Sequence, residues 1–380
     1  MKTRKKVIIS GGGTGGHIFP ALSIAGALKR LEPDIDILFV GAEGKMEMER
    51  VPDAGFTIEG LPVRGLNRKN SLSNISVLVD FFRCVLKARK IIKRFHPNIV
   101  IGVGGYASGP ICMAANLARV PVLLQEQNSY AGVMNKRLAN KAVKICVAYE
   151  GMERFFKPSK LILTGNPVRP EIAHIFDKEQ DRELKQAEGL EYYGLSPDKL
   201  TVLVTGGSLG AGTLNKMMES NLNVLKDWTQ VQIIWQCGSF YYDVLSSKWK
   251  DSLPSNVKMT AFLKRMDLAY ACSDIVVARA GAGTISELCL VAKAAILIPS
   301  PNVAEDHQTH NAMTLVNKGA ALMIRDAEAV EKFIPILSEL AGDVGSRLEL
   351  SRNMATLGVK DSDIRIAKEI VGIIDTWGGL

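Results

Sequence analysis

Residues 6–22 read KVIISGGGTGGHIFPAL, and this stretch decides the fold. A short apolar run comes first, then five glycines and one threonine at residues 11–16, then a segment of helical character. This order predicts a β-strand, a glycine loop and an α-helix. Backbone N–H groups at the N-terminus of a helix bind anions, so we expect the loop to hold a phosphate or pyrophosphate.

The same loop matches a dinucleotide-binding pattern only in part. Gly11, Gly13 and Gly16 satisfy G-x-G-x-x-G. That fold also needs an acidic residue at the end of its second strand, whereas the next predicted strand, DILFVG (36–41), ends in Val-Gly. A nicotinamide or flavin enzyme is therefore disfavoured. His17 follows the glycines and is a candidate general base near neutral pH.

Strand–loop–helix units recur along the chain in two series. Nearly continuous apolar strands alternating with helices indicate parallel sheets covered on both faces. The pattern breaks in the polar residues 176–200 and restarts with KLTVLVTGGSLGAGTLNKMM (199–218), which predicts two α/β domains with a boundary near residue 168. Glycine-rich loops end predicted strands at residues 11–16, 104–109, 206–212 and 281–283. Ligands bind beyond the carboxyl ends of parallel strands, so we expect these loops to face a cleft between the domains.

Composition agrees with a two-domain globular protein. The chain has 380 residues, of which 47% are apolar and 23% charged. The net charge of +8 suits anionic ligands such as nucleotides or phospholipid surfaces. The six cysteines include no C-x-x-C pair, and no apolar run approaches a signal peptide or the ~18 residues of a membrane span. We expect a cytoplasmic protein, or one attached to a membrane from the cytoplasmic side.

Three acidic or histidine patterns permit metal or ribose binding. His307 and His310 form H-x-x-H without an evident third ligand, and Asp34-Ile-Asp36 resembles a D-x-D motif but precedes its strand, so we predict no metal site. Glu287 lies about one turn into the helix after the 281–283 loop. It is either a ligand of ribose hydroxyls or an acid that is favourable in the first turn of a helix.

Residues 72–95, LSNISVLVDFFRCVLKARKIIKRF, predict a helix with two apolar stripes. One stripe is enough to cover a sheet. The second is bordered by six cations, which suits an anionic membrane surface. A well-buried helix explains the pattern equally well.

Taken together, these segments resemble the MurG family of glycosyltransferases of peptidoglycan synthesis along nearly the whole chain. The motifs that carry the resemblance are GGTGGHIFPAL (12–22), GVGGYASGP (102–110), QEQN (125–128), TGNPVR (164–169), GGSLGA (206–211), RAGAGTISE (279–287) and HQTHNA (307–312). The chain departs from the family at Leu209, where glutamine is usual. A second departure is a charged insertion around residues 176–192, interpreted as a surface elaboration.

The resemblance implies an α/β GT-B fold, in which two Rossmann-like domains present their parallel sheets to an inter-domain cleft. Residues 1–167 and a C-terminal helix at about 355–380 would form the acceptor-binding, membrane-facing domain. Residues 168–354 would form the domain that binds UDP-N-acetylglucosamine. The implied reaction is inverting transfer of N-acetylglucosamine from that donor to the C4 hydroxyl of the muramyl sugar in lipid I, which gives lipid II and UDP.

The family's motifs also imply roles for individual residues. His17 and Glu126 are the catalytic candidates, and which of them is the base stays open. Glu287 would bind the ribose, Leu263 would contact the base through its backbone, and Gln308 would hold the sugar. The substrate-binding residues implied in this way are Thr14, Gly15, Gly16, Tyr106, Asn128, Arg169, Ser208, Leu263, Ala282, Gly283, Thr284, Glu287 and Gln308. No metal and no cofactor are expected.

The implied partners are UDP-N-acetylglucosamine, lipid I and an anionic membrane surface, with other cell-wall synthesis proteins as candidates and no nucleic acid. The expected location is the cytoplasmic face of the bacterial inner membrane. Two alternatives are a related GT-B transferase acting on diacylglycerol and a nucleotide-binding scaffold at the membrane surface. A UDP-N-acetylglucosamine epimerase is a more distant enzyme alternative. Turnover with different acceptors separates these alternatives.

Overall fold

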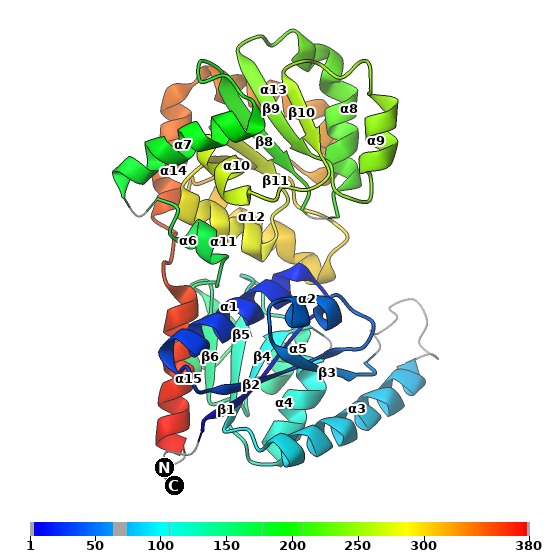
Figure 1. Ribbon diagram of the computed structural model, residues 1–380, viewed down its shortest axis with the longest axis vertical. Helices are drawn as coiled ribbons and strands as arrows, with labels where there is room; N and C mark the ends of the chain where they lie inside the picture. The colour runs from blue at the N-terminus through cyan, green and yellow to red at the C-terminus, as the bar shows by residue number, and fades with distance from the viewer. Residues whose placement is uncertain (1–3, 64–73, 106, 177, 208, 378–380) are drawn as a thin grey trace. The chain divides into compact units, whose positions relative to one another are not determined.

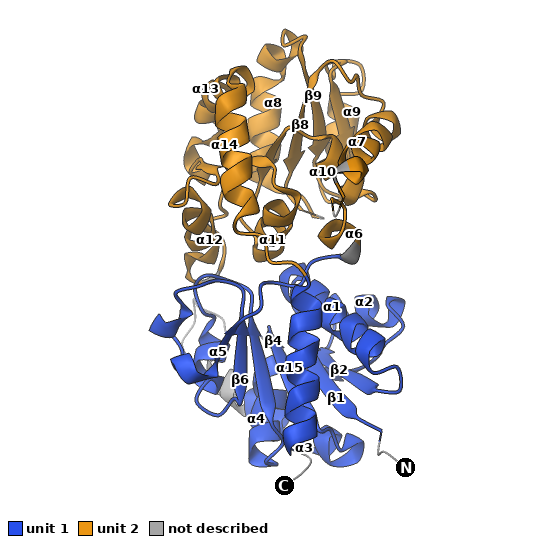
Figure 2. Ribbon diagram, turned by 90° about the vertical axis from the view of Figure 1, so that its left-hand side faces the viewer, with its two compact units in different colours: residues 1–169, 361–380 blue, residues 170–360 orange. Residues whose placement is uncertain are grey.

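The computed structural model describes residues 4–63, 74–105, 107–176, 178–207 and 209–377 (Figure 1). The chain forms two compact units, coloured separately in Figure 2. Unit 1 comprises residues 1–169 and 361–380, and unit 2 comprises residues 170–360. The chain returns to unit 1 at residue 361 rather than at about 355, because α14 (Val344–Ala355) packs on α11 and β12 of unit 2.

Unit 1 contains a seven-stranded parallel sheet in the order β3-β2-β1-β4-β5-β6-β7. Its strands are β1 Lys6–Gly11, β2 Asp36–Ala42, β3 Thr57–Leu61, β4 Ile99–Gly104, β5 Val122–Glu126, β6 Lys144–Val147 and β7 Leu161–Leu163. Its helices are α1 Gly15–Leu31, α2 Glu47–Asp53, α3 Asn74–Phe95, α4 Ser108–Leu117, α5 Val133–Leu138 and α15 Ser362–Trp377, with 3₁₀ turns at Met152–Arg154 and Pro158–Lys160.

The strands of unit 1 alternate their side chains between two buried faces. Ile8 packs with the α3 and α4 side, whereas Val7 and Ile9 pack with α1 and α15. Side chains on a strand point alternately to opposite faces, so a sheet buried on both faces needs the continuous apolar run found in KVIIS. Figure 2 shows α15 lying along this sheet beside α1.

Unit 2 contains a six-stranded parallel sheet in the order β10-β9-β8-β11-β12-β13. Its strands are β8 Leu200–Thr205, β9 Val231–Gln236, β10 Val257–Thr260, β11 Ile275–Ala278, β12 Ala294–Leu297 and β13 Leu322–Met323. Its helices are α6 Pro170–Ala173, α7 Glu179–Tyr193, α8 Gly212–Lys226, α9 Tyr242–Lys248, α10 Met266–Cys272, α11 Ala282–Val291, α12 His307–Val316, α13 Ala329–Gly342 and α14, with 3₁₀ turns at Ala304–Asp306 and Asp326–Glu328.

The two sheets confirm the predicted α/β class with a parallel sheet in each half. The four glycine-rich loops each follow a strand of a sheet: β1 and β4 in unit 1, and β8 and β11 in unit 2. The strands of each sheet run parallel, so the two loops of each unit lie at the same edge of its sheet.

Candidate active site

The glycine loop of unit 1 follows β1 after a shift in strand register and leads directly into α1. Thr14 is the N-cap residue in an extended conformation, and its carbonyl accepts a hydrogen bond from the N–H of His17 at 3.1 Å. The first N–H groups of an α-helix have no acceptor inside the helix. The N–H groups of Gly15 and Gly16 therefore lie where an anionic ligand needs donors.

Glu47 holds the same loop, and the sequence did not predict this contact. Its carboxylate is fully buried at the start of α2 and accepts hydrogen bonds from the N–H of Gly13 (2.9 Å) and of Ala42 (3.0 Å). A buried carboxylate is stable only with such donors. The signal in the sequence is weak, because several acidic residues follow the second strand and only the structure shows that Glu47 is the one that binds the loop.

The ring of His17 lies between the glycine loop and the end of β4. Thr14 Oγ1 and His17 Nδ1 are 3.3 Å apart. When Nδ1 donates its proton to Thr14, Nε2 keeps the lone pair that a general base needs. Gly104 has a φ of +103°, and a Cβ at that position would lie 2.5 Å from the Cδ2 of His17. The β4 loop therefore needs glycine at this position to make room for the histidine ring.

Glu126, at the end of β5, holds the loop that follows this strand. Its side chain is 2% exposed, and its oxygens accept hydrogen bonds from the N–H of Gly132 (2.9 Å), from Asn135 Nδ2 (2.9 Å) and from both nitrogens of Asn128 (3.1 and 3.3 Å). Burial raises the pKa of the Glu126 carboxyl, and these four donors oppose that rise. The catalytic role of Glu126 stays a prediction, and the structure shows that its carboxylate also binds Asn128, which is a predicted substrate-binding residue.

The phosphate-type loop of unit 2 is built from backbone contacts at the end of β8. Thr205 Oγ1 donates to the side chain of Gln236 and accepts from the N–H of Gly207 at 3.3 Å. The N–H of Gly210 donates to the carbonyl of Gly207 at 2.9 Å. A Cβ at Gly210 would lie 2.0 Å from the carbonyl oxygen of Cys237, so this loop packs backbone to backbone against the end of β9. It leads into the N-terminus of α8, a second anion-binding end.

Glu287 is buried on α11, with 8% of its side chain exposed. Its Oε2 accepts a hydrogen bond from the hydroxyl of Tyr270 on α10 at 3.0 Å. The first turn of α11 contains Ala282, Gly283 and Thr284 and begins after the N-cap residue Gly281. A carboxylate close to a helix N-terminus and fixed by a tyrosine is well suited to accept hydrogen bonds from ribose hydroxyls.

The remaining predicted residues lie on loops and helix starts. Leu263 is 3% exposed in the segment between β10 and α10. Gln308, near the start of α12, accepts a hydrogen bond from the N–H of Ser300 at 2.8 Å. Arg169 follows Val168, whose carbonyl accepts a hydrogen bond from Ser23 of α1 at 3.3 Å, so the approach to the linker is fixed to unit 1.

Each unit thus gathers its predicted residues at the glycine-bearing edge of its sheet. Tyr106 and Ser208 lie outside the described residues. A site shared by the two units stays a prediction. In the part of the chain that the structure describes, no group of three or more His, Cys, Asp or Glu side chains is arranged to hold a metal ion.

Two units that each hold a parallel sheet, with glycine loops at the carboxyl ends of its strands, define an α/β protein of the GT-B class. Residues 7–147 match the N-terminal domain of glycosyltransferase family 28, and residues 201–366 match its C-terminal domain. The chain belongs to glycosyltransferase family 28.

Curated relatives within this family share about half of their residues with the chain. The chain is 52% identical over 368 residues to the UDP-N-acetylglucosamine--N-acetylmuramyl-(pentapeptide) pyrophosphoryl-undecaprenol N-acetylglucosamine transferase of Bacteroides fragilis, covering 96% of this chain and 95% of the relative. It is 51% identical over 377 residues to the enzyme of the same name from Bacteroides thetaiotaomicron, covering 99% of each. The crystal structure of MurG from Acinetobacter baumannii has a TM-score of 0.76 at 24% identity and covers 97% of this chain and 99% of that one, which supports the fold. The predicted resemblance to the MurG glycosyltransferases is confirmed.

Proposed function

We propose that this protein transfers N-acetylglucosamine from UDP-N-acetylglucosamine to the C4 hydroxyl of the muramyl sugar of lipid I, giving lipid II and UDP. The observation that carries the proposal is the identity of about half of all residues, over nearly the full chain, with enzymes whose names state this transfer. The glycine loops and Glu287 support the proposal, because helix N-termini suit phosphate groups and a fixed carboxylate suits ribose hydroxyls.

In this reaction the C4 oxygen of the acceptor attacks the anomeric carbon of the donor sugar. The bond from that carbon to the diphosphate breaks as the new glycosidic bond forms. The configuration at the anomeric carbon inverts, which gives a β-linkage. His17 takes the proton of the attacking hydroxyl through Nε2, since Nδ1 is engaged with Thr14. The leaving UDP carries the electron pair away as negative charge on its terminal phosphate.

The protein stabilises that charge with fixed dipoles. The 206–212 loop and the N-terminus of α8 direct N–H groups to the diphosphate, and Arg169 adds a positive charge. Glu287, oriented by Tyr270, holds the ribose. The acceptor pyrophosphate binds the N-terminus of α1, where Gly15 and Gly16 supply the donors.

An acceptor assay tests the proposal. UDP release from UDP-N-acetylglucosamine is measured with a lipid I analogue, with diacylglycerol and with no acceptor. We expect release only with the muramyl lipid. Release only with diacylglycerol supports the related lipid glycosyltransferase instead, and tight UDP binding without any turnover supports a nucleotide-binding scaffold.

We further infer that unit 1 docks on an anionic membrane through α3 and α4, which pack side by side. Four large apolar side chains on these helices are exposed: Phe82, Leu86, Met113 and Leu117. A hollow of about 470 Å³ beside them is lined by Arg89, Lys90, Lys93 and His96, among others. Apolar side chains next to cations suit an interface with anionic lipids.

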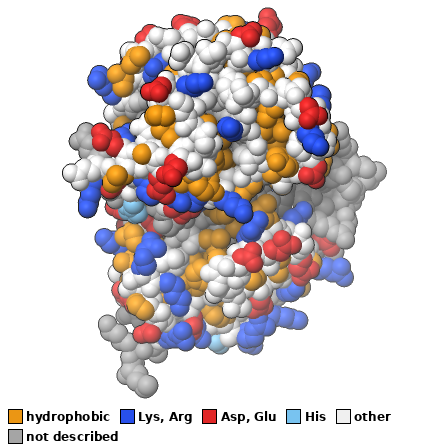
Figure 3. Space-filling view, turned by 45° about the horizontal axis from the view of Figure 1, so that its top comes forward, with side chains coloured by type: hydrophobic (Ala, Val, Ile, Leu, Met, Phe, Trp, Pro, Cys, Tyr) orange, Lys and Arg blue, Asp and Glu red, His pale blue; other side chains and the backbone are white. Residues whose placement is uncertain are grey.

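Figure 3 shows basic and acidic side chains interspersed on the face that it draws. The described residues that line the hollow beside α3 include Arg89, Lys90 and Lys93 but no Asp or Glu. The first predicted stripe of α3 is buried at Cys84, Ala88 and Ile91. In the second stripe Phe82 is 62% exposed, whereas Val85 is buried in the core. In the described part of the chain, none of the helices is long and apolar enough to cross a bilayer. The substrate explains the docking, because the lipid tail of lipid I stays in the membrane while its sugar reaches the enzyme.

A further inference from the structure

Helix α7, which falls in the segment interpreted from the sequence as a surface elaboration, packs closely on α10. A Cβ at Gly189 of α7 would lie 2.6 Å from the carbonyl oxygen of Leu268 and 2.9 Å from the Cβ of Cys272. Glycine is therefore needed for the two helices to approach at this distance. Contact of this kind fixes the position of α10 within unit 2.

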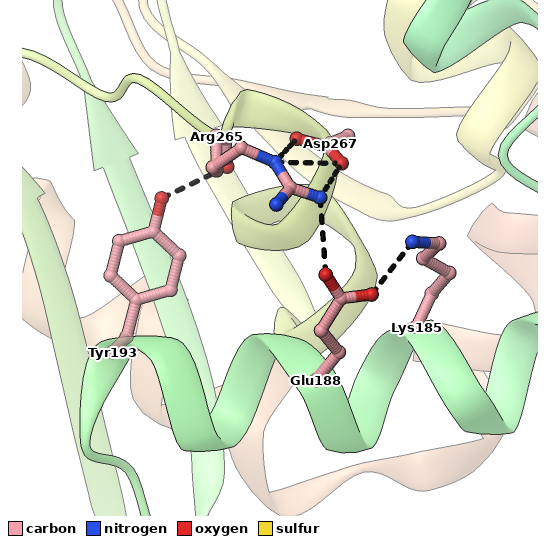
Figure 4. Close-up of polar contacts among 5 residues, drawn as sticks. All are labelled: Lys185, Glu188, Tyr193, Arg265 and Asp267. Atoms are coloured by element: carbon pink, nitrogen blue, oxygen red, sulfur yellow. Dashed lines mark hydrogen bonds and ion pairs between the residues drawn. The ribbon is translucent and has the colours of Figure 1, made fainter.

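Polar contacts reinforce this packing at the start of α10 (Figure 4). The guanidinium of Arg265 binds Asp267 through two nitrogens, at 2.9 and 2.6 Å, and reaches Glu188 of α7 at 3.2 Å. Lys185 binds the other oxygen of Glu188 at 2.6 Å. The hydroxyl of Tyr193, at the end of α7, donates to the backbone carbonyl of Arg265 at 2.9 Å.

Asp267 is buried and Tyr193 is half-buried, so both groups lie partly or fully within the contact between the two helices. Burial raises the pKa of the Tyr193 hydroxyl well above its usual range, so it stays protonated and donates. Burial also raises the pKa of Asp267, but the hydrogen bonds from Arg265 and from the backbone N–H of Leu268 outweigh that effect and the pKa falls. Asp267 is therefore a carboxylate that keeps Arg265 in place.

Helix α10 is connected at both of its ends to residues that are predicted to bind the donor. Arg265 follows Leu263 by two residues in the segment that enters α10. Toward the other end, Tyr270 donates its hydroxyl hydrogen bond to Glu287. Movement of α10 thus changes the position of the predicted base contact and of the predicted ribose contact together.

We propose that α7 is a brace that fixes the uracil-binding segment 261–265 before the donor binds, with Tyr193, Glu188 and Arg265 as positioning residues. This rests on the proposed function, in which Leu263 contacts the base and Glu287 the ribose. A loop ordered in advance loses less entropy when its ligand binds. The brace therefore determines the affinity for the donor and the selectivity for its base. It does not change the rate of the transfer reaction at the anomeric carbon.

The test uses the full chain with Tyr193→Phe and Glu188→Gln, and binding is measured by calorimetry with UDP and with CDP. Tyr193→Phe should weaken UDP binding about 2- to 10-fold, the range of one lost hydrogen bond. Glu188→Gln should have a smaller effect that shrinks further in high salt, because this ion pair is exposed. The preference for UDP over CDP should fall in both variants. The KM for UDP-N-acetylglucosamine should rise while kcat and the acceptor KM stay unchanged.

Glu219→Gln is the matched control, since Glu219 of α8 forms a comparable interhelical ion pair with Lys248 of α9 at 2.6 Å. It should leave both binding constants unchanged. Unchanged UDP affinity and UDP/CDP preference in the two α7 variants would overturn the brace. A lower kcat, a higher KM for both substrates and a lower melting temperature would also overturn the brace, because that pattern indicates a general loss of structure. If the Tyr193→Phe variant does not fold, the UDP affinity and the UDP/CDP preference of the Glu188→Gln variant, which changes an exposed side chain, test the proposal. A wild-type protein that binds UDP but transfers no sugar counts against the proposed function and leaves the binding test intact.

Discussion

At the scale of single residues, Glu47 shows how a buried acid shapes an anion-binding loop. Its two oxygens each accept one backbone N–H, from Gly13 and from Ala42. The N–H of Gly13 is therefore directed at the protein, and the donors left for a ligand are those at the start of α1. The loop that we propose to bind phosphate is thus oriented by a buried negative charge.

Replacing Glu47 by glutamine should disturb this loop specifically. An amide accepts one of the two N–H groups and turns its own NH₂ toward the other, which leaves a buried donor unsatisfied at a cost of about 1–3 kcal/mol. We expect a lower free energy of unfolding and a raised KM for the lipid acceptor, with donor affinity unchanged. Glu49→Gln, on the exposed side of the same helix, is the control. An unchanged acceptor KM in Glu47→Gln would show that the loop does not contact the acceptor.

Glu287→Ala should weaken donor binding more than it slows the chemical step. A hydrogen bond to a charged group contributes about 1.5–3 kcal/mol, or roughly 10- to 150-fold in affinity. Tyr270→Phe should have a smaller effect in the same direction, because it removes only the group that orients the carboxylate. The measurement is the Kd of UDP by calorimetry. If Glu287→Ala leaves this Kd unchanged, the ribose assignment is wrong.

These residues mark the limit of prediction from sequence. The glycine loops and His17 could be found because their spacing is local. Glu47 contacts a loop that is distant in sequence, and Tyr270 reaches Glu287 from another helix, so neither contact leaves a local pattern. Glu126 belongs to a recognisable motif, but only the structure shows that its oxygens are already occupied.

At the scale of elements, the period of the apolar residues was the reliable signal. It predicted two series of parallel strands, and both sheets confirm this. Each series opens with a strand that is followed by a glycine-rich loop. The period of the apolar residues could not predict which element a polar helix packs against. Helix α7 has few apolar residues, and its contact with α10 depends on Gly189 and Tyr193, whose roles are visible only when both helices are in place.

Neutralising the cations of α3 should release the protein from membranes. We expect the triple change of Arg89, Lys90 and Lys93 to glutamine to weaken binding to anionic vesicles roughly 100-fold, since each basic residue near such a surface adds about 1 kcal/mol. Activity on a short-chain, water-soluble acceptor should remain. Glutamine at Lys226, Lys250 and Lys258 of unit 2 removes the same charge and serves as control. Equal loss in both triples would mean that net charge alone drives binding, and no loss in either would place the membrane contact elsewhere.

The helix N-termini also predict the response to chelation. The leaving diphosphate is stabilised by backbone dipoles and Arg169 in the proposed mechanism, so EDTA should leave most of the activity intact. The measurement is the rate of UDP release before and after chelation. Complete loss of activity that magnesium or manganese restores is incompatible with this mechanism.

At the scale of the whole molecule, α15 joins the end of the described chain to unit 1. Its apolar face is buried against α1 and the sheet, and the residues that form it are Ile366, Ala367, Ile370, Ile373 and Ile374. Arg30 of α1 and Asp363 of α15 form an ion pair at the start of this contact. Unit 1 therefore needs residues from both sides of unit 2 to complete its core.

Ile370→Ala tests this dependence. Deletion of a fully buried isoleucine side chain costs about 2–5 kcal/mol through lost burial and the cavity left behind. We expect this loss in the free energy of unfolding measured with urea. Lys368→Ala on the exposed side of the same helix should change it little. An equal effect of the two changes would mean that α15 acts through helix formation and not through its buried face.

The interruption of unit 1 by unit 2 has a consequence for biosynthesis. A ribosome delivers residues 1–169 first but releases α15 only after all of unit 2. At about 5–20 residues per second this delay lasts roughly 10–40 s. During that time α1 packs on the sheet, but the apolar surface that α15 later covers stays exposed. We expect chaperones to bind the nascent first domain at this surface. Unit 2 is contiguous and matures first, so the domain whose synthesis starts earliest is the last to be completed.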